Sequence, residues 1–407
     1  MAQNFLPYGR HCIDEADIAA VSAVLRGDFL TTGPNVDAFE TAFAAAVDAP
    51  YAISCANGTA ALHLAMLALD VGEGDACIVP TITFLATANC ARYAGAEVVF
   101  ADVDPDTGLM TAATFEAALA KAKARGLRPR VVLPVHLSGH AVAIDELAEI
   151  AEREGLAIVE DACHAIGSQV RTGGTWRPVG ACSRSAMSVF SFHPVKTIAC
   201  GEGGAVTTRD PALAKRLKRL RSHGMVREAA EMSDSSLSLD AGGLANPWSY
   251  EMPDIGFNYR QTDIQSALGL SQLRKLDHFK SRRAGLAAAY DKALARCGNW
   301  VAPVRPPTHS RATLHLYVAL IDFDAIGVTR AQAMRKLHEQ GIGTQVHYIP
   351  VHRQPYYVAR YGGEWLEGAE RYYKRCLSLP LFPDMADSDV ERVVRALETL
   401  PVLAPAV

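Results

Sequence analysis

The sequence predicts an α/β fold, with a mainly parallel sheet in a large first domain and a smaller α+β domain after it. Short apolar runs alternate with helical patterns from about residue 51 to residue 208, which is typical of a parallel sheet covered by helices. A sustained helical pattern at residues 262–294 would join the two domains. The chain of 407 residues is also longer than a domain with a single hydrophobic core usually is. We expect domains at residues 1–270, with an N-terminal arm, and at residues 271–407.

The expected strands of the first domain are short apolar runs that lead into helical patterns or turns. In chain order they are YAIS, ACIVP, EVVFADVD, VVLPVHLSG, AIVEDAC, AMSVFSF and GAVTT. Ligands of such sheets bind beyond the carboxyl ends of the strands, where loops meet the starts of helices. We therefore expect the functional site where these runs end.

The second half of the chain is less regular. Residues 225–250 are polar and rich in serine and glycine, so we expect a long loop that could serve as a lid. After the long helical pattern, HLYVALIDF and GTQVHYIP are strand-like, whereas TRAQAMRKLHEQG and SDVERVVRALETL are helical. This mixture predicts the smaller α+β domain.

Composition narrows the class of protein. A formal net charge of −4 with interspersed signs argues against nucleic-acid binding, which normally needs a basic surface. No apolar run is long enough to span a membrane, and the first residues lack a signal-peptide core. The nine cysteines are scattered without a CxxC pair, which argues against a zinc or iron–sulfur site. We expect a cytoplasmic protein without a bound metal.

The segment from Ser188 to Thr208, SVFSFHPVKTIACGEGGAVTT, carries the densest chemical pattern. An apolar strand leads into a turn that contains Lys196, and Gly201, Gly203 and Gly204 follow it. A lysine that attacks an aldehyde must be neutral, so it needs a partly desolvated position such as this one. The glycines allow a sharp turn and leave room for a flat ring. Taken alone, a lysine in a glycine-rich turn is most often a surface residue.

The run AIVEDACHAIG ends an expected strand at an acidic pair. Asp161 at the end of a buried strand could form an ion pair with a protonated ring nitrogen. It could equally cap the helix that follows. His164 could reach a phenolic oxygen on the same ring, or could simply pack and form local hydrogen bonds.

The run SCANGTAALHLAMLAL predicts a strand that leads into a helix. The free N–H groups and the positive dipole end of that helix favour a phosphate, with Gly58 allowing close approach and Thr59 adding a hydroxyl. Ser191 could add another contact, although many helices begin this way without binding phosphate. Phe84 follows another expected strand and could stack on a ring, which adds on the order of 1 kcal/mol, or could pack in the core. Together with Lys196, these motifs predict a pyridoxal 5'-phosphate (PLP) site.

The sequence resembles the DegT/StrS family of sugar aminotransferases over nearly its whole length. The most specific matches are FSFHPVKTIACGEGGAVTT, EDACHAIGS and GFNYRQTDIQSALGLSQL. A branch of this family, the UDP-sugar 4-aminotransferases of pseudaminic acid biosynthesis, is similar in HPVK, RSHGM and PWSYEMPDIGFNYR. Ala199 and Cys200 depart from the threonine pair usual in that branch, and the loop at residues 232–246 is longer. The resemblance implies the type I aspartate-aminotransferase fold and PLP as cofactor.

The resemblance also implies a role for each residue named above. Lys196 would form the Schiff base, and Asp161 would pair with the pyridinium nitrogen. His164 would bond the phenolic oxygen, and Phe84 would stack on the ring. The phosphate would be held by Gly58, Thr59 and Ser191.

In addition, the resemblance implies a homodimer with a shared active site, in which Asn258 of the partner subunit completes the phosphate site. Arg260 could bind an anionic group of the sugar nucleotide or of glutamate, or could form a structural salt bridge. His347, Tyr348 and His352 match the substrate-side segment of the family, although a cluster of histidine and tyrosine could equally be packing.

The implied reaction transfers an amino group from glutamate to the 4-keto group of a UDP-linked 6-deoxy-N-acetylhexosamine by a ping-pong mechanism. A 3-amino product or a dTDP-linked sugar is an alternative. Dehydratases of the same fold carry histidine at the lysine position, so the presence of Lys196 argues against that activity. A non-catalytic regulator that senses PLP or sugar would be expected to have lost Lys196 or Asp161.

Overall fold

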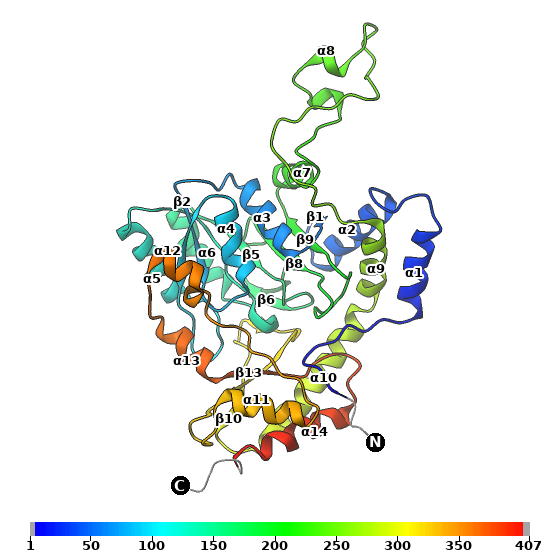
Figure 1. The fold of residues 1–407 in the computed structure, drawn as a ribbon. Helices are drawn as coiled ribbons and strands as arrows, with labels where there is room; N and C mark the ends of the chain where they lie inside the picture. The colour runs from blue at the N-terminus through cyan, green and yellow to red at the C-terminus, as the bar shows by residue number, and fades with distance from the viewer. Residues whose placement is uncertain (1–4, 402–407) are drawn as a thin grey trace.

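A computed structural model describes residues 5–401 and has a seven-stranded sheet at its centre (Figure 1). From one edge to the other, the strands are β1 (Tyr51–Cys55), β9 (Gly204–Thr208), β8 (Met187–Ser191), β5 (Ala157–Asp161), β4 (Arg128–Val132), β2 (Asp75–Pro80) and β3 (Glu97–Ala101). Only β9 runs antiparallel to its neighbours, β1 and β8, within this sheet. The predicted mainly parallel sheet is confirmed.

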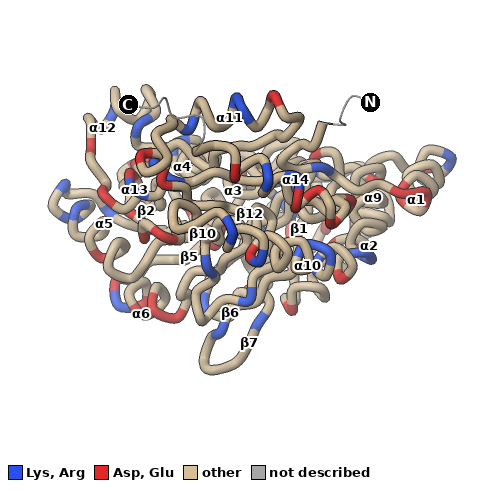
Figure 2. Tube along the Cα trace, turned by 90° about the horizontal axis from the view of Figure 1, so that it is seen from below, with Lys and Arg blue, Asp and Glu red and all other residues tan. Residues whose placement is uncertain are grey.

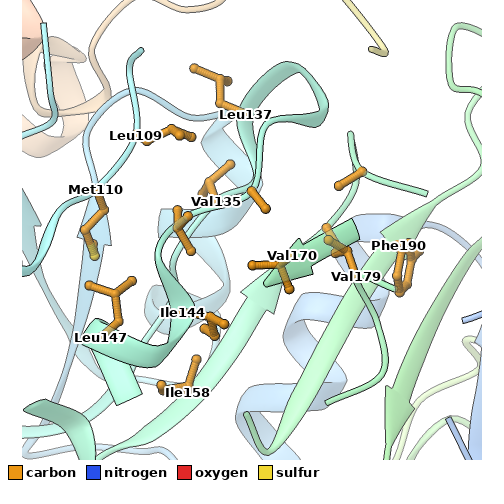
Figure 3. Close-up of a cluster of buried hydrophobic side chains, with 14 of the residues drawn as sticks. Leu109, Met110, Val135, Leu137, Ile144, Leu147, Ile158, Val170, Val179 and Phe190 are labelled. Atoms are coloured by element: carbon orange, nitrogen blue, oxygen red, sulfur yellow. The ribbon is translucent and has the colours of Figure 1, made fainter. Parts of the chain in front are cut away.

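Helices cover both faces of this sheet. One face packs against α2 (Pro34–Ala46), α5 (Ala112–Ala124) and α6 (Ile144–Glu154), and the other against α3 (Gly58–Ala68), α4 (Leu85–Tyr93) and α7 (Pro211–Leu220). Successive strand residues point to opposite faces, so Ile158 belongs to the first core and Val159 to the second. Figure 3 shows Ile158 in the first core with Ile144, Leu147 and Val135. Burial on both faces explains why the strands are continuous apolar runs.

A second, three-stranded sheet is built by the C-terminal part of the chain. Its strands are β10 (Val301–Pro303), β12 (Tyr317–Ile321) and β13 (Cys376–Leu379), in that order. Its separate core is shared with α10 (Leu276–Leu294), α11 (Arg330–Glu339) and α14 (Asp387–Glu398). The strand-like run GTQVHYIP is not a strand, because only Gln345 pairs there, with Ser378. Five consecutive residues of that run, 345–349, line the cavity described below.

The connection between the two sheets differs from the single long helix that the pattern indicates. α9 (Asp263–Arg274) and α10 are separate helices that meet at Lys275. α1 (Glu15–Leu25) packs on α9. A small third sheet joins β11 (Ser310–Arg311) to β6 (Gln169–Thr172) and β7 (Thr175–Pro178), so the two halves of the chain are also linked there. The domain boundary at residue 270 stays a prediction.

The polar segment between α7 and α9 forms an arm, defined here as residues 226–251, that extends away from the rest of the chain (Figure 1). Its base is closed by Val226 and Glu251, whose backbones exchange hydrogen bonds of 2.8 and 3.0 Å. The short helix α8 (Ser235–Ser238) lies near its tip. No residue of this arm lines the cavity described below, so the expected lid does not cover the site of its own chain.

Two short helices, α12 (Pro355–Tyr361) and α13 (Glu367–Arg375), complete the fold. α12 contacts β3, where the Tyr361 hydroxyl accepts from Val98 N–H at 2.9 Å. In the face shown in Figure 2, lysine and arginine alternate with aspartate and glutamate along the chain. Among residues 5–401, no helix is both long and apolar enough to cross a membrane.

Candidate active site

A cavity of about 640 Å³ opens where β5 and β8 end and where α3 and α4 begin. This is the place that the topology of a parallel sheet favours for a ligand. The cavity brings together most of the residues that the sequence singles out, which come from five separate segments. They are Gly58, Thr59, Phe84, Asp161, His164, Ser191, Lys196, His347 and Tyr348.

Lys196 lies in the turn that follows β8. Its backbone N–H donates to the carbonyl of His193 at 2.8 Å, and Cys200 N–H donates to the carbonyl of Phe192 at 2.8 Å. Burial lowers the pKa of the Lys196 amine from its ordinary value of 10.5, whereas Cys163 and Asp161 act in the opposite direction. A lowered pKa increases the fraction of neutral amine, which is the form that can attack a carbonyl.

Asp161 is the last residue of β5 and is 5% exposed. Its Oδ2 accepts a hydrogen bond of 2.7 Å from the Thr87 hydroxyl, and its Oδ1 accepts one of 3.1 Å from Cys163 N–H. Hydrogen bonds from donors favour the ionised form of a carboxylate. The two hydrogen bonds therefore hold the carboxylate in one orientation at the wall of the cavity.

The start of α3 lies directly against the end of β8. A Cβ atom added to Gly58 would lie 2.9 Å from Ser191 Cβ and 3.2 Å from Ser191 Oγ, so a side chain has no room there. Asn57 caps the helix by accepting from Ala60 N–H at 2.8 Å. The N–H groups of the first turn have no acceptor within the helix and attract anions. Together with the Ser191 hydroxyl, they form a site suited to a phosphate.

His164 is buried between two partners. Its Nδ1 accepts from Ser138 N–H at 3.3 Å, and its Nε2 lies 3.1 Å from Tyr348 Oη. Burial holds the pKa of His164 well below its usual 6.5, and the charges of Lys196 and His347 act in the same direction. The ring is therefore neutral, and acceptance at Nδ1 assigns its proton to Nε2. That N–H is the group that could bond a phenolic oxygen.

Aromatic side chains form the outer wall. Phe84 is 56% exposed at the start of α4, and its ring centroid lies 6.1 Å from that of Tyr348. His347 Nδ1 lies 2.8 Å from Ser378 Oγ, and burial lowers the pKa of His347 to about 3. The wall beside Lys196 is thus formed by uncharged rings.

Three of the predicted residues lie outside this cavity. His352 is buried, with Nδ1 2.7 Å from Thr81 Oγ1 and Nε2 3.7 Å from Glu370. Asn258 pairs through its backbone with Ser222. Arg260 lines a second cavity of about 860 Å³ at the base of the arm, and its buried Nε has no hydrogen-bond partner among residues 5–401. Neither Asn258 nor Arg260 reaches the Lys196 cavity of its own chain.

Several residues that line the cavity escaped the sequence analysis, among them Tyr8, Thr83, Thr87, His315 and Gln345. His315 is 4% exposed, its ring lies 4.6 Å from that of His164, and its Nδ1 has no partner within the described part of the chain. Thr83 and Thr87 are four positions apart, a helical spacing that places both on one side of the helix start beside Phe84 and that could have indicated them. No local sequence pattern indicates His315, because its contact with His164 forms only in the folded chain.

The polar groups of the cavity match the functional groups of PLP. A lysine of lowered pKa, a fixed carboxylate and a neutral histidine N–H match its aldehyde, ring nitrogen and phenolic oxygen. The cradle beside Gly58, which a Cβ would fill, matches its phosphate.

Comparisons with known proteins agree with this chemistry. The model of the DegT/DnrJ/EryC1/StrS aminotransferase family matches residues 11–398. PseC of Helicobacter pylori, an aminotransferase involved in the biosynthesis of pseudoaminic acid, is 28% identical, with a TM-score of 0.85 over 98% of this chain and 99% of that chain. DesV of S. venezuelae is 30% identical, with a TM-score of 0.82 over the same shares. Spr1654 of Streptococcus pneumoniae, described as a sugar aminotransferase and solved in its PLP form, is 26% identical, with a TM-score of 0.85 and again 98% and 99% coverage.

Proposed function

The chain belongs to the DegT/DnrJ/EryC1/StrS aminotransferase family, and we propose that its substrate is a UDP-linked 6-deoxy-N-acetylhexosamine that is aminated at its 4-keto carbon. As a member of this family, the protein is a PLP-dependent sugar aminotransferase. Glutamate is the proposed amino donor, and the two half-reactions alternate in a ping-pong cycle. The similarity to PseC, which acts in pseudoaminic acid biosynthesis, supports a sugar of this class.

One observation carries the assignment of the site. Lys196, in the turn after β8, and Asp161, at the end of β5, line one cavity together with the start of α3. Gly58, Thr59 and Ser191 would hold the phosphate of PLP, and Phe84 would stack on its ring. Asp161 would pair with the ring nitrogen, and His164 would donate from Nε2 to the phenolic oxygen. When bound, PLP supplies an electron sink for the electrons left at the amino donor's α-carbon.

Lys196 would attach the cofactor and then move protons. Burial lowers the pKa of its amine, which favours the neutral form that can accept a proton and later release it. We assign to Nζ the removal of the α-proton of glutamate and, in the second half-reaction, the proton transfer at the sugar carbon that receives nitrogen. The neutral rings of His164 and His347 do not compete with Nζ for that proton, since burial lowers the pKa of both.

A homodimer with a shared site accounts for features that a single chain leaves unexplained. Among residues 5–401, no arginine lines the Lys196 cavity, although a sugar nucleotide carries a diphosphate. Arg227 and Arg260 line the second cavity without an ion pair to any of residues 5–401. The arm beside them exposes large apolar side chains, including Trp248 at 77%. We assign Asn258 and Arg260 to the partner's active site, with the arm packed on the partner.

Product analysis tests the substrate. The purified protein should be given glutamate with UDP- or dTDP-linked 4-keto sugars, and with 3-keto isomers, and the products identified by mass and NMR. A 4-amino UDP-sugar as the fastest product supports the assignment. Faster amination of a dTDP-linked or 3-keto sugar would show that this sugar, and not the UDP-linked 4-keto sugar, is the preferred substrate. No amination, with a PLP absorbance indifferent to glutamate, would favour a sensing role.

Tyr348 and His347 are the proposed contacts on the sugar side of the cavity. The Tyr348 hydroxyl already lies 3.1 Å from His164 Nε2, so it lies beside the expected position of the cofactor. His352 is assigned an indirect role, because its ring is buried against Thr81 and does not line the cavity.

A further inference from the structure

We propose that Thr87 is a positioning residue that holds the Asp161 carboxylate turned toward the ring nitrogen of PLP. The inference rests on the proposed role of Asp161. It adds a residue from α4, an element to which the sequence motifs assigned only the ring platform.

The contact between Thr87 and Asp161 is short and buried. Thr87 Oγ1 lies 2.7 Å from Asp161 Oδ2, and Thr87 is 0% exposed. An O–H···O hydrogen bond to a carboxylate is among the stronger contacts in proteins, particularly where water is absent. Cys163 N–H occupies the other oxygen, Oδ1, at 3.1 Å. The two donors fix the plane of the carboxylate from two sides.

The direction of the hydrogen bonds follows from the donors present. An ionised carboxylate can only accept, so Thr87 must use its single proton on Asp161. Thr83 Oγ1 lies 2.7 Å from Thr87 Oγ1 and must therefore donate to it. The result is a directed chain from Thr83 through Thr87 to Asp161. Each hydroxyl polarises the next, which strengthens the last bond in the chain.

The backbone around Thr87 explains why this residue can reach Asp161. Phe84 is the N-cap of α4, and Thr87 N–H donates to the Phe84 carbonyl at 3.2 Å, which places Thr87 in the first turn. The N-terminal turn of a helix has a positive potential that favours a nearby carboxylate. The same turn thus presents Phe84 at the ring position and the Thr87 hydroxyl to the acid.

Binding of PLP to full-length, cofactor-stripped protein tests the proposal without relying on turnover. Thr87→Val should raise the PLP dissociation constant about tenfold, the effect expected for one charge-assisted hydrogen bond. Thr87→Ser should restore affinity to within about threefold, and Thr83→Val should cost about threefold, the range of a neutral hydrogen bond. Thr207→Val is a matched control, because Thr207 is also 0% exposed and donates to Gly180 O at 2.8 Å outside the cavity.

A double-mutant cycle separates positioning from direct contact. If Thr87 acts through Asp161, Thr87→Val should change PLP affinity less than about twofold once Asp161→Asn is present. An equal loss in both backgrounds would overturn the proposal, as would unchanged affinity in Thr87→Val alone. If Asp161→Asn itself binds PLP as the wild type does, the role of Asp161 falls together with this inference. If Thr87→Val does not fold, the PLP dissociation constants of Thr83→Val and Thr87→Ser test the proposal instead.

Discussion

The Lys196 cavity and the arm differ in where their side chains find partners. In the cavity, side chains are held by contacts between elements, as Thr87 of α4 holds Asp161 of β5 and Tyr348 contacts His164. In the arm, the hydrogen bonds stay local, and the Glu251 carboxylate accepts from the N–H groups of Ser233 and Asp234. Beyond its base, the arm exposes large apolar side chains, with Leu244 71% exposed.

This difference shows which properties one chain can determine alone. The groups proposed to contact the PLP ring, Lys196, Asp161 and His164, all come from one chain, so substitutions of them should act at every protein concentration. The arm presents apolar surface that a single chain does not bury, and such patches mark interaction sites. Substitutions there should act through dimerisation and should therefore depend on protein concentration.

The largest effect is expected at Lys196. Lys196→Ala should lower kcat by roughly 10⁴-fold or more, because the amine that moves the protons is lost. Steady-state assays at several protein concentrations would measure this, with circular dichroism to verify the fold. The loss should be the same at every concentration. Activity within tenfold of the wild type would remove Lys196 from the mechanism.

The arm should give the next largest effect. Trp248→Ser should weaken the dimer by roughly 30-fold, since a central interface tryptophan commonly contributes about 2 kcal/mol. Sedimentation velocity across a dilution series would give the dimer dissociation constant. Trp365→Ser is the matched control, because Trp365 is 71% exposed in a different part of the surface and Trp248 is 77% exposed. Equal dissociation constants for the two variants would show that the arm is not the interface.

A smaller effect is expected at the wall of the cavity. Phe84→Leu should reduce PLP affinity about fivefold, because ring stacking adds about 1 kcal/mol beyond simple burial. Fluorescence titration of the cofactor-stripped protein would show it. Phe29→Leu serves as the control, since Phe29 is 54% exposed and lies outside the cavity, whereas Phe84 is 56% exposed within it. Equal affinity in both variants would leave Phe84 with a packing role.

The smallest effect concerns stability and its pH dependence. Burial lowers the pKa of Lys196 below 10.5, so the unfolded chain holds more protons between the two pKa values. The stability of the cofactor-free wild type should therefore rise with pH through that window. Lys196→Met should be more stable by about 0.5 kcal/mol at neutral pH. Urea unfolding at pH 7 and pH 10 should show this advantage shrinking, and an advantage that grows with pH would contradict the account.

Much of the site could be predicted because parallel strands place their carboxyl ends together. The sequence predicts a buried strand that ends in Asp161 and another that precedes Lys196. These strands, β5 and β8, are neighbours in the sheet. The sequence predicts that Gly58 allows close approach of a phosphate, and in the structure the same glycine lies against Ser191. The family resemblance, the fold class and the PLP cofactor are confirmed by the family match and the structural neighbours.

Other features depended on contacts that no local pattern records. Thr87 matters through its approach to Asp161, 74 positions along the chain. His315 contacts His164 from the far half of the sequence. The run GTQVHYIP is strand-like in sequence, but it pairs with β13 only at Gln345, and its residues 345–349 line the cavity. The arm was expected as a loop, and its direction away from the chain's own site could not be read from composition.

The covalent attachment point of PLP is the most direct test of the proposed site. The PLP-loaded protein should be reduced with borohydride, digested, and mapped by mass spectrometry. A single modified peptide with the cofactor mass on Lys196 is the predicted result. Modification of another lysine, or none when the absorbance shows bound PLP, would contradict the assignment of this cavity as the active site.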